Sequence, residues 1–176
     1  MLQAIVLAGG KGERLWPLTQ DKPKPMVEVA GKPLLCHHLK WLCGQGVQDV
    51  VVACGYRAEV IVKFLNQNSL NSLKAKCSIE DQPLGRGGAI KKAALVLPRP
   101  KEPAIISQGD IITDIPLKEA AILHLETKSL LTMILVPYRS RYGVADVGPD
   151  NLLGSGLQGK ASFAILGQYW DIYSFS

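Results

Sequence analysis

The sequence has few aromatic residues, no long apolar stretch and no long run of like charges. Aromatic side chains make up 6% of the 176 residues, and the tryptophans (Trp16, Trp41 and Trp170) are scattered, which argues against a stacking surface for single-stranded nucleic acid. No apolar run reaches the ~18 residues of a membrane-spanning helix. Without a run of five or more like charges, no basic tail is indicated. We therefore expect neither nucleic acid nor a membrane as a partner.

The cysteines and the amino terminus lack the signs of an exported protein. Four cysteines are present without any C-x-x-C spacing, and we interpret them as reduced, buried thiols. The opening MLQAIVLAGG carries no basic residue before its apolar stretch, so we do not expect a signal peptide. These features predict a cytoplasmic protein.

Hydrophobic residues and net charge point to a folded protein that binds anions. The hydrophobic fraction of 47% is enough for a core, and the net charge of +5 suits anionic small molecules. The length favours a single α/β domain, residues 1–176.

Short apolar runs alternate with helical patterns along the chain. Predicted strands cover residues 3–8, 47–53, 76–79, 104–107 and 130–136, with a further strand at 171–175. Predicted helices begin at Pro33 and cover residues 56–65, 90–97 and 117–125. Such alternation predicts a Rossmann-like, mostly parallel sheet flanked by helices. Ligands of these sheets bind beyond the carboxyl ends of the strands.

Glycines and basic residues follow the first predicted strand. The segment LAGGKGERLWPLT lets backbone amides approach phosphate oxygens closely. It is neither a dinucleotide fingerprint, since Leu15 holds the third glycine position, nor a Walker A loop. Arg14 offers a bidentate fork for phosphate. Lys24 lies between Pro23 and Pro25, which restrict its backbone.

These motifs resemble one enzyme family over most of the chain. LAGGxGxRLxPLT, then PKPM and GKPL, then EDQPLGRGGAI, QGD and RYGV, are similar to the nucleoside-diphosphate-sugar pyrophosphorylases. This family includes mannose-1-phosphate and heptose-1-phosphate guanylyltransferases and glucose-1-phosphate thymidylyl- and uridylyltransferases. The resemblance implies transfer of a nucleoside monophosphate from a nucleoside triphosphate to a sugar 1-phosphate, with release of pyrophosphate. Glu13 and Arg86 depart from the threonine that the family often has at these positions.

The resemblance also implies roles for individual residues. Arg14 corresponds to the residue that holds the β- and γ-phosphates, and Lys24 to the residue that contacts the α-phosphate. Asp110 corresponds to a Mg²⁺ ligand, and a carboxylate at a strand end facing a phosphate loop suits that ion. The alternative is that Asp110 caps the following segment. The residues expected around the nucleotide base and phosphates are Leu7, Ala8, Gly9, Gly10 and Gly12.

The segment from Glu80 resembles the family's base-specificity loop. Gly85 would let the backbone approach the base and ribose. The Glu80 carboxylate only accepts hydrogen bonds, and guanine offers it two adjacent donors, whereas uracil and thymine offer one donor between two acceptors. This reasoning favours GTP. The alternative is that Glu80 is a solvated charge at a strand end.

The carboxyl-terminal part matches the family least well. By resemblance, residues 1–115 form a nucleotide-binding core and 116–176 a partial sugar-binding part, with Gly143 and Lys160 near the sugar phosphate. The family continues past this length with a second metal-binding aspartate, so we expect an enzyme from which the carboxyl-terminal part is missing, with reduced activity. The alternative is a non-catalytic nucleotide-binding or regulatory domain. A glycosyltransferase would need a D-x-D motif, which the sequence lacks. A homo-oligomer stays open, as does the identity of the sugar.

Overall fold

The computed structural model of the chain describes residues 2–68, 72–134, 138–139, 163–164 and 170–173. The chain forms two compact units, Met1–Thr132 together with Asp171–Ser176, and Met133–Trp170. Each unit is considered by itself. The expected division at residue 115 concerns which substrate each part binds, and it stays a prediction.

The predicted alternation of strands and helices is confirmed. The strands of the larger unit and its boundary are β1 (Leu2–Ala8), β2 (Glu28–Val29), β3 (Lys32–Pro33), β4 (Val47–Cys54), β5 (Lys74–Ile79), β6 (Ala104–Gln108), β7 (Leu131–Ile134) and β10 (Trp170–Tyr173). The helices are α1 (Leu34–Gly44), α2 (Ala58–Gln67), α3 (Gly85–Ala94) and α4 (Leu117–Thr127), with short 3₁₀ turns η1 (Glu13–Leu15) and η2 (Lys24–Met26).

The main sheet has the strand order β5-β4-β1-β6-β10-β7. Strand β1 pairs in parallel with β4 on one side and β6 on the other, and β4 pairs in parallel with β5. Strand β10 returns antiparallel to β6, with Asp171 opposite Ile106. The mostly parallel α/β fold is therefore confirmed. Because Ala8 pairs with Cys54 and Cys54 with Ile79, the parallel strands end together at one edge.

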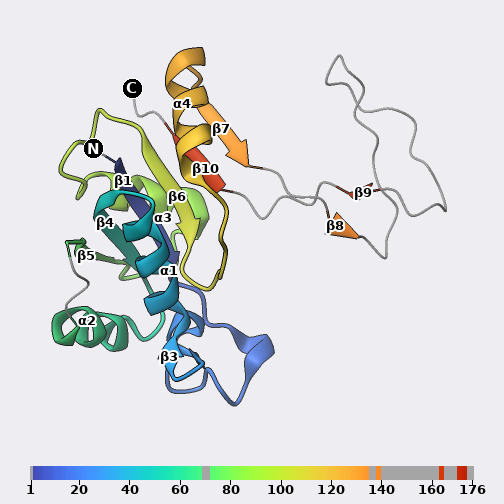
Figure 1. Cartoon of the computed structure of the whole chain (residues 1–176). Helices are drawn as coiled ribbons and strands as arrows, with labels where there is room; N and C mark the ends of the chain where they lie inside the picture. The colour runs from blue at the N-terminus through green and yellow to red at the C-terminus, as the bar shows by residue number, and fades with distance from the viewer. Residues whose placement is uncertain (1, 69–71, 135–137, 140–162, 165–169, 174–176) are drawn as a thin grey trace, which may run out of the picture. The chain divides into compact units, whose positions relative to one another are not determined.

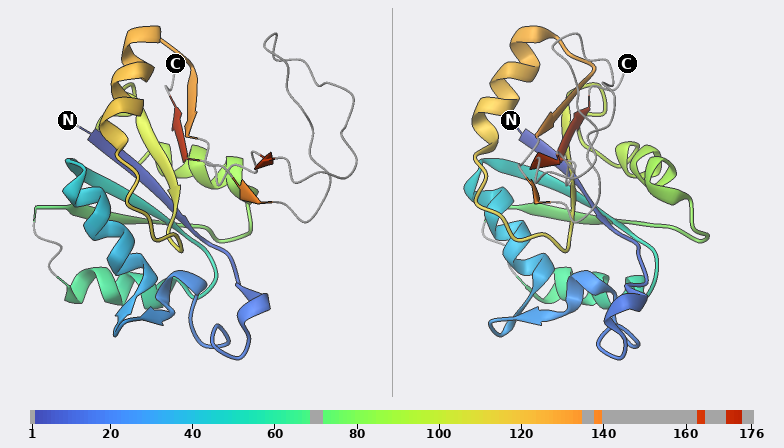
Figure 2. Two further views of the ribbon diagram at one scale, coloured as in Figure 1. Left: turned by 45° about the vertical axis from the view of Figure 1, so that its right-hand side comes forward. Right: turned by 90° about the vertical axis from the view of Figure 1, so that its right-hand side faces the viewer.

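Helices cover both faces of this sheet. Helix α3 lies on one face, with α1 and α4 on the other (Figure 1; Figure 2, right). Under α3, Ala89 and Ala93 pack with Ile5 and Val51 of the central strands. These small side chains let the helix approach the sheet closely. On the α1 face, the residues Leu35, Leu39 and Leu42 are fully buried, as their helical spacing predicts.

Two helical patterns differ in detail from the structure. The apolar spacing predicts a helix that reaches Leu97, but α3 ends at Ala94 and Leu97 is buried from the turn that follows. In α4, Leu117 and His124 are buried as the pattern predicts, whereas Leu125 is 63% exposed. Helix α4 thus buries a narrower stripe than its sequence suggests.

Two short paired strands form the described part of the smaller unit. Its strands β8 (Tyr138–Arg139) and β9 (Phe163–Ala164) pair antiparallel. Gly143 and Lys160, the residues expected near the sugar phosphate, lie outside the described residues. Among the helices that the structure describes, none has the length and hydropathy needed to cross a bilayer.

Candidate functional site

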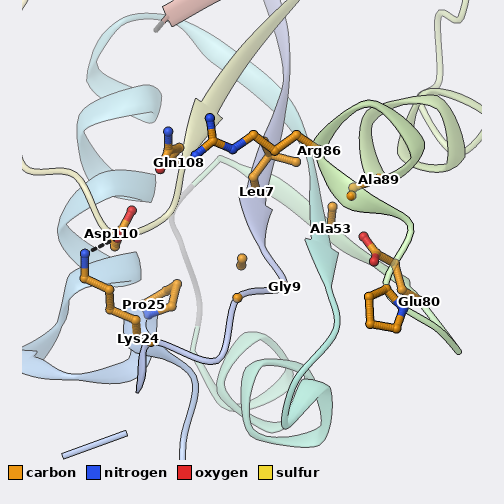
Figure 3. A pocket seen from close by; sticks show the side chains of 15 residues that line it. Leu7, Gly9, Lys24, Pro25, Ala53, Glu80, Arg86, Ala89, Gln108 and Asp110 are labelled. Carbon is orange, nitrogen blue, oxygen red and sulfur yellow. Dashed lines mark ion pairs between the residues drawn. The ribbon is translucent and has the colours of Figure 1, made fainter. Parts of the chain in front are cut away.

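A cavity of about 340 Å³ opens where the parallel strands end. Segments far apart in the sequence meet there: the loop after β1, the Lys24 turn, the loop between β5 and α3, and the end of β6 (Figure 3). The lining residues are Leu7, Ala8, Gly9, Gly10, Gly12, Lys24, Pro25, Ala53, Glu80, Pro83, Gly85, Arg86, Ala89, Gln108 and Asp110. All seven residues expected around the nucleotide line this cavity, together with Lys24 and Asp110. Their roles remain predictions.

Close packing around the first loop requires glycine at two positions, Gly55 and Gly12. A Cβ on Gly55 would lie 3.0 Å from the Gly9 carbonyl oxygen, and the Tyr56 amide donates to that oxygen at 3.2 Å. Gly12 has a φ of 66°, in the left-handed region that favours glycine. A Cβ on Gly12 would lie 3.0 Å from the Cβ of Lys24. The loop is thus pressed between the end of β4 and the Lys24 turn.

An ion pair joins the two sides of the cavity. The Nζ atom of Lys24 lies 2.5 Å from Oδ2 of Asp110 (Figure 3). The Asp110 side chain is 18% exposed and the Lys24 side chain 41%, so both charges are partly shielded and still open to a ligand. Residues 86 positions apart in the chain meet because β6 lies beside β1.

The turn around Lys24 is rigid for reasons visible in the sequence. Pro23 and Pro25 are both buried. Backbone bonds close the turn, since the Met26 amide donates to Pro23 O at 2.8 Å and the Val27 amide to Lys24 O at 3.0 Å. The prolines that suggested a braced lysine therefore do anchor it.

The loop between β5 and α3 supplies the opposite wall. Glu80 is half-buried, and its Oε2 accepts the Leu84 amide at 3.1 Å. The carboxylate therefore helps to organise the loop, and its role toward a nucleotide base stays a prediction. Gly85, with a φ of 69°, starts α3.

Two polar cavity residues were not among the predicted site residues. Gln108 is the last residue of β6, and Arg86 lies in the first turn of α3. The QGD motif that pointed to Asp110 already contained Gln108. Arg86 is one of the two residues that depart from the family pattern.

Arg14 lies outside this cavity. It lines a neighbouring depression of about 520 Å³ together with Gly12 and Lys24. The two depressions share Gly12 and Lys24, so Arg14 and Lys24 are on the same side of the molecule. Glu13, an unexpected negative charge in this loop, is 67% exposed and lies 3.9 Å from Nζ of Lys11. That lysine partly offsets its charge.

The cavity side chains suit a metal ion that takes some of its ligands from a bound substrate. In the described part of the chain, no three His, Cys, Asp or Glu side chains gather as a metal site. Mg²⁺ commonly uses one or two carboxylates and takes its other ligands from phosphates and water. The Asp110 carboxylate, which faces the cavity beside the glycine loop, fits that pattern.

A buried histidine supports the segment that carries Asp110. His38 of α1 is 1% exposed, and its Nε2 lies 2.8 Å from Oγ of Ser107. Burial lowers the pKa of His38 to about 4, against smaller opposing effects from a backbone hydrogen bond with Ile111 and the charge of Asp110. The neutral ring therefore contacts the chain on both sides of Asp110.

Parallel strands ending in a glycine-rich loop, with a lysine and an aspartate converging on one cavity, are typical of α/β proteins that bind nucleotides. Residues 3–156 match the nucleotidyl transferase family, and the chain belongs to this family. This match confirms the resemblance to sugar-1-phosphate nucleotidyltransferases.

Named relatives and solved structures agree with this assignment. The chain is 35% identical over 153 residues to a mannose-1-phosphate guanyltransferase of Aspergillus oryzae, covering 85% of this chain and 42% of that protein. The crystal structure of HddC from Yersinia pseudotuberculosis has a TM-score of 0.81 and 32% identity, over 99% of this chain and 77% of that one. A structure of HddC complexed with GMP-PN has a TM-score of 0.73, 30% identity and coverage of 99% and 74%. The chain spans less than half the length of the curated relatives it matches.

Proposed function

We propose that this chain binds GTP and a sugar 1-phosphate and transfers GMP to the sugar phosphate, releasing pyrophosphate. The ion pair of Lys24 with Asp110 beside the glycine loop carries this proposal. It brings together one cation, which would contact phosphate, and one carboxylate, which would hold a metal ion, at the same point of the cavity. The named relatives support the choice of a guanylyltransferase reaction.

The cavity suggests how the nucleotide lies. We place the base between Gly85 and Glu80 and the phosphates along the loop from Gly9 to Gly12. The open acceptor positions of the Glu80 carboxylate suit the two adjacent donors of guanine. Its bond from the Leu84 amide holds the carboxylate in place without using both oxygens.

The reaction needs no covalent intermediate. A phosphate oxygen of the sugar 1-phosphate attacks the α-phosphorus in line, the bond to the β-phosphate oxygen breaks, and pyrophosphate leaves with that electron pair. The chain must hold two anions close together, so its work is positioning and charge neutralisation. Lys24 would contact the α-phosphate, and Arg14, from the adjoining depression, the leaving pyrophosphate.

Asp110 would hold Mg²⁺, which supplies charge neutralisation for the phosphates when bound. In the structure Lys24 pairs with this carboxylate. Binding of substrate would therefore exchange partners: Lys24 turns to phosphate as the Asp110 oxygen becomes free for the ion.

Replacement of either partner of the ion pair tests the proposal. Loss of one electrostatic stabiliser costs about 10²-fold or more in turnover, so Lys24→Ala and Asp110→Ala should each lower pyrophosphate release by that factor. A thermal-shift panel of nucleoside triphosphates with Mg²⁺ should show the largest stabilisation with GTP, because bound ligand raises apparent stability.

Matched controls separate a local effect from a general one. Lys40→Ala removes an exposed lysine of α1, and Asp114→Ala removes an exposed carboxylate outside the cavity. Both should behave as wild type. Near-normal turnover in both Lys24→Ala and Asp110→Ala would refute the assigned roles. Stabilisation by GTP without any pyrophosphate release would instead identify a non-catalytic nucleotide-binding domain.

A further inference from the structure

We propose that Arg86 is a substrate-contacting residue that binds a phosphoryl group in the cavity, with the phosphate of the sugar 1-phosphate as its favoured partner. This inference rests on the proposed function and adds a specificity residue to it. The phosphate of the nucleotide is the other source of the same chemistry.

The direction of the side chain is the first observation. Arg86 starts from α3 and lines the cavity, as does Gln108 at the end of β6. Figure 3 shows the guanidinium directed from α3 across the cavity toward Gln108, and away from Gly9. The long side chain therefore crosses the space where substrate would lie. Its charged end points toward Gln108 rather than toward Gly9 of the loop assigned to the triphosphate, so the acceptor phosphate is the better match.

The charge balance of the cavity is the second observation. Lys24 is already paired with Asp110 at 2.5 Å. Among the residues that the structure describes, no carboxylate forms an ion pair with Arg86. Within the described residues, Arg86 is thus a cavity cation that no carboxylate pairs with, and a planar guanidinium can bind two phosphate oxygens at once.

Local stability does not explain an arginine at this position. Arg86 lies in the first turn of α3, where the helix macrodipole disfavours a positive charge. No acidic residue lies in that turn itself, and the nearby Glu80 carboxylate accepts the Leu84 amide at the N-cap and forms no ion pair with Arg86. An anion in the cavity would relieve this unfavourable arrangement.

The test compares Arg86→Gln and Arg86→Lys with wild type by titration calorimetry. One titration measures the affinity for GTP in the presence of Mg²⁺. The other measures the affinity for mannose 1-phosphate in the presence of a non-hydrolysable GTP analogue. Loss of a charge-assisted contact should weaken mannose 1-phosphate about tenfold or more in Arg86→Gln. Arg86→Lys should retain part of the affinity, because it keeps the charge but not the fork. In steady-state turnover, the KM for the sugar phosphate should rise more than kcat falls.

Lys91→Gln is the matched control. It makes the same charge change on the same helix, at an exposed residue outside the cavity, and should leave both affinities unchanged. If Arg86→Gln weakens the affinities for GTP and for the sugar phosphate equally, Arg86 still contacts a phosphoryl group, but that group belongs to the nucleotide. If wild type binds both ligands and Arg86→Gln binds them with the same affinity, the inference is overturned. If wild type binds neither ligand, the proposed function fails and this inference fails with it.

Discussion

The imidazole of His38 is almost completely buried, so its protonation is coupled to folding. The pKa falls from its ordinary 6.5 to about 4 in the folded chain because burial penalises the charged ring. Between these values the unfolded chain binds a proton that the folded chain does not. Stability therefore rises with pH across this window and is lost as the pH falls from about 6.5 toward 4. Integrated from pH ~7.5 down to pH ~5, the loss is about 2 kcal/mol.

His38→Gln isolates this contribution. Glutamine does not titrate, and its amide still offers a donor and an acceptor toward Oγ of Ser107. Urea unfolding of both proteins at the two pH values gives four free energies of unfolding. Carboxylates that titrate in this range act alike in both proteins, so the wild type should lose about 2 kcal/mol more than the variant. Equal losses in the two proteins would refute the coupling of His38 to folding.

Two further predictions concern the loop after β1. Gly12→Ala should lower the free energy of unfolding by roughly 1–2 kcal/mol, because residue 12 has a left-handed φ. The added Cβ would also push against Lys24 and should therefore weaken GTP binding. Gly44→Ala, at the end of α1, where the Cβ would meet nothing within 4 Å, is the control. Thermal melts with and without GTP and Mg²⁺ compare the two variants, and equal melts would contradict the strain argument. Tyr56→Phe removes the bond from the Tyr56 hydroxyl to Gln20 O at 2.6 Å and should cost about 1 kcal/mol. Faster amide exchange confined to residues 9–20 is expected, and exchange identical to wild type would show that the hydroxyl does not restrain the loop.

The candidate site was accessible to sequence reasoning because its residues follow strands. Glycines after β1, a carboxylate after β6 and a glutamate after β5 are each a local signal. Once the alternation predicts a parallel sheet, the carboxyl ends of neighbouring strands must share an edge. The convergence of Gly9, Glu80 and Asp110 on one cavity follows from that rule without any knowledge of distances.

Two details of the site depend on the path of the chain and could not be read from the sequence: the depression that Arg14 lines and the packing of His38. Arg14 was expected with Lys24 at the phosphates, and the structure places it in the adjoining depression, because η1 and the following loop direct it there. The support of Asp110 by His38 depends on how α1 packs behind β6. No spacing in the sequence links residues 69 positions apart such as His38 and Ser107.

The sequence by itself determined the class of fold and the strand ends at which a ligand could bind, since periodicity and glycine-rich turns are local properties. Only the tertiary structure decided which charges face one another. The Lys24–Asp110 pair, the direction of Arg86 across the cavity and the antiparallel return of β10 all depend on contacts between distant segments. Such contacts arise from packing of the whole sheet and its helices, which no short stretch of sequence encodes.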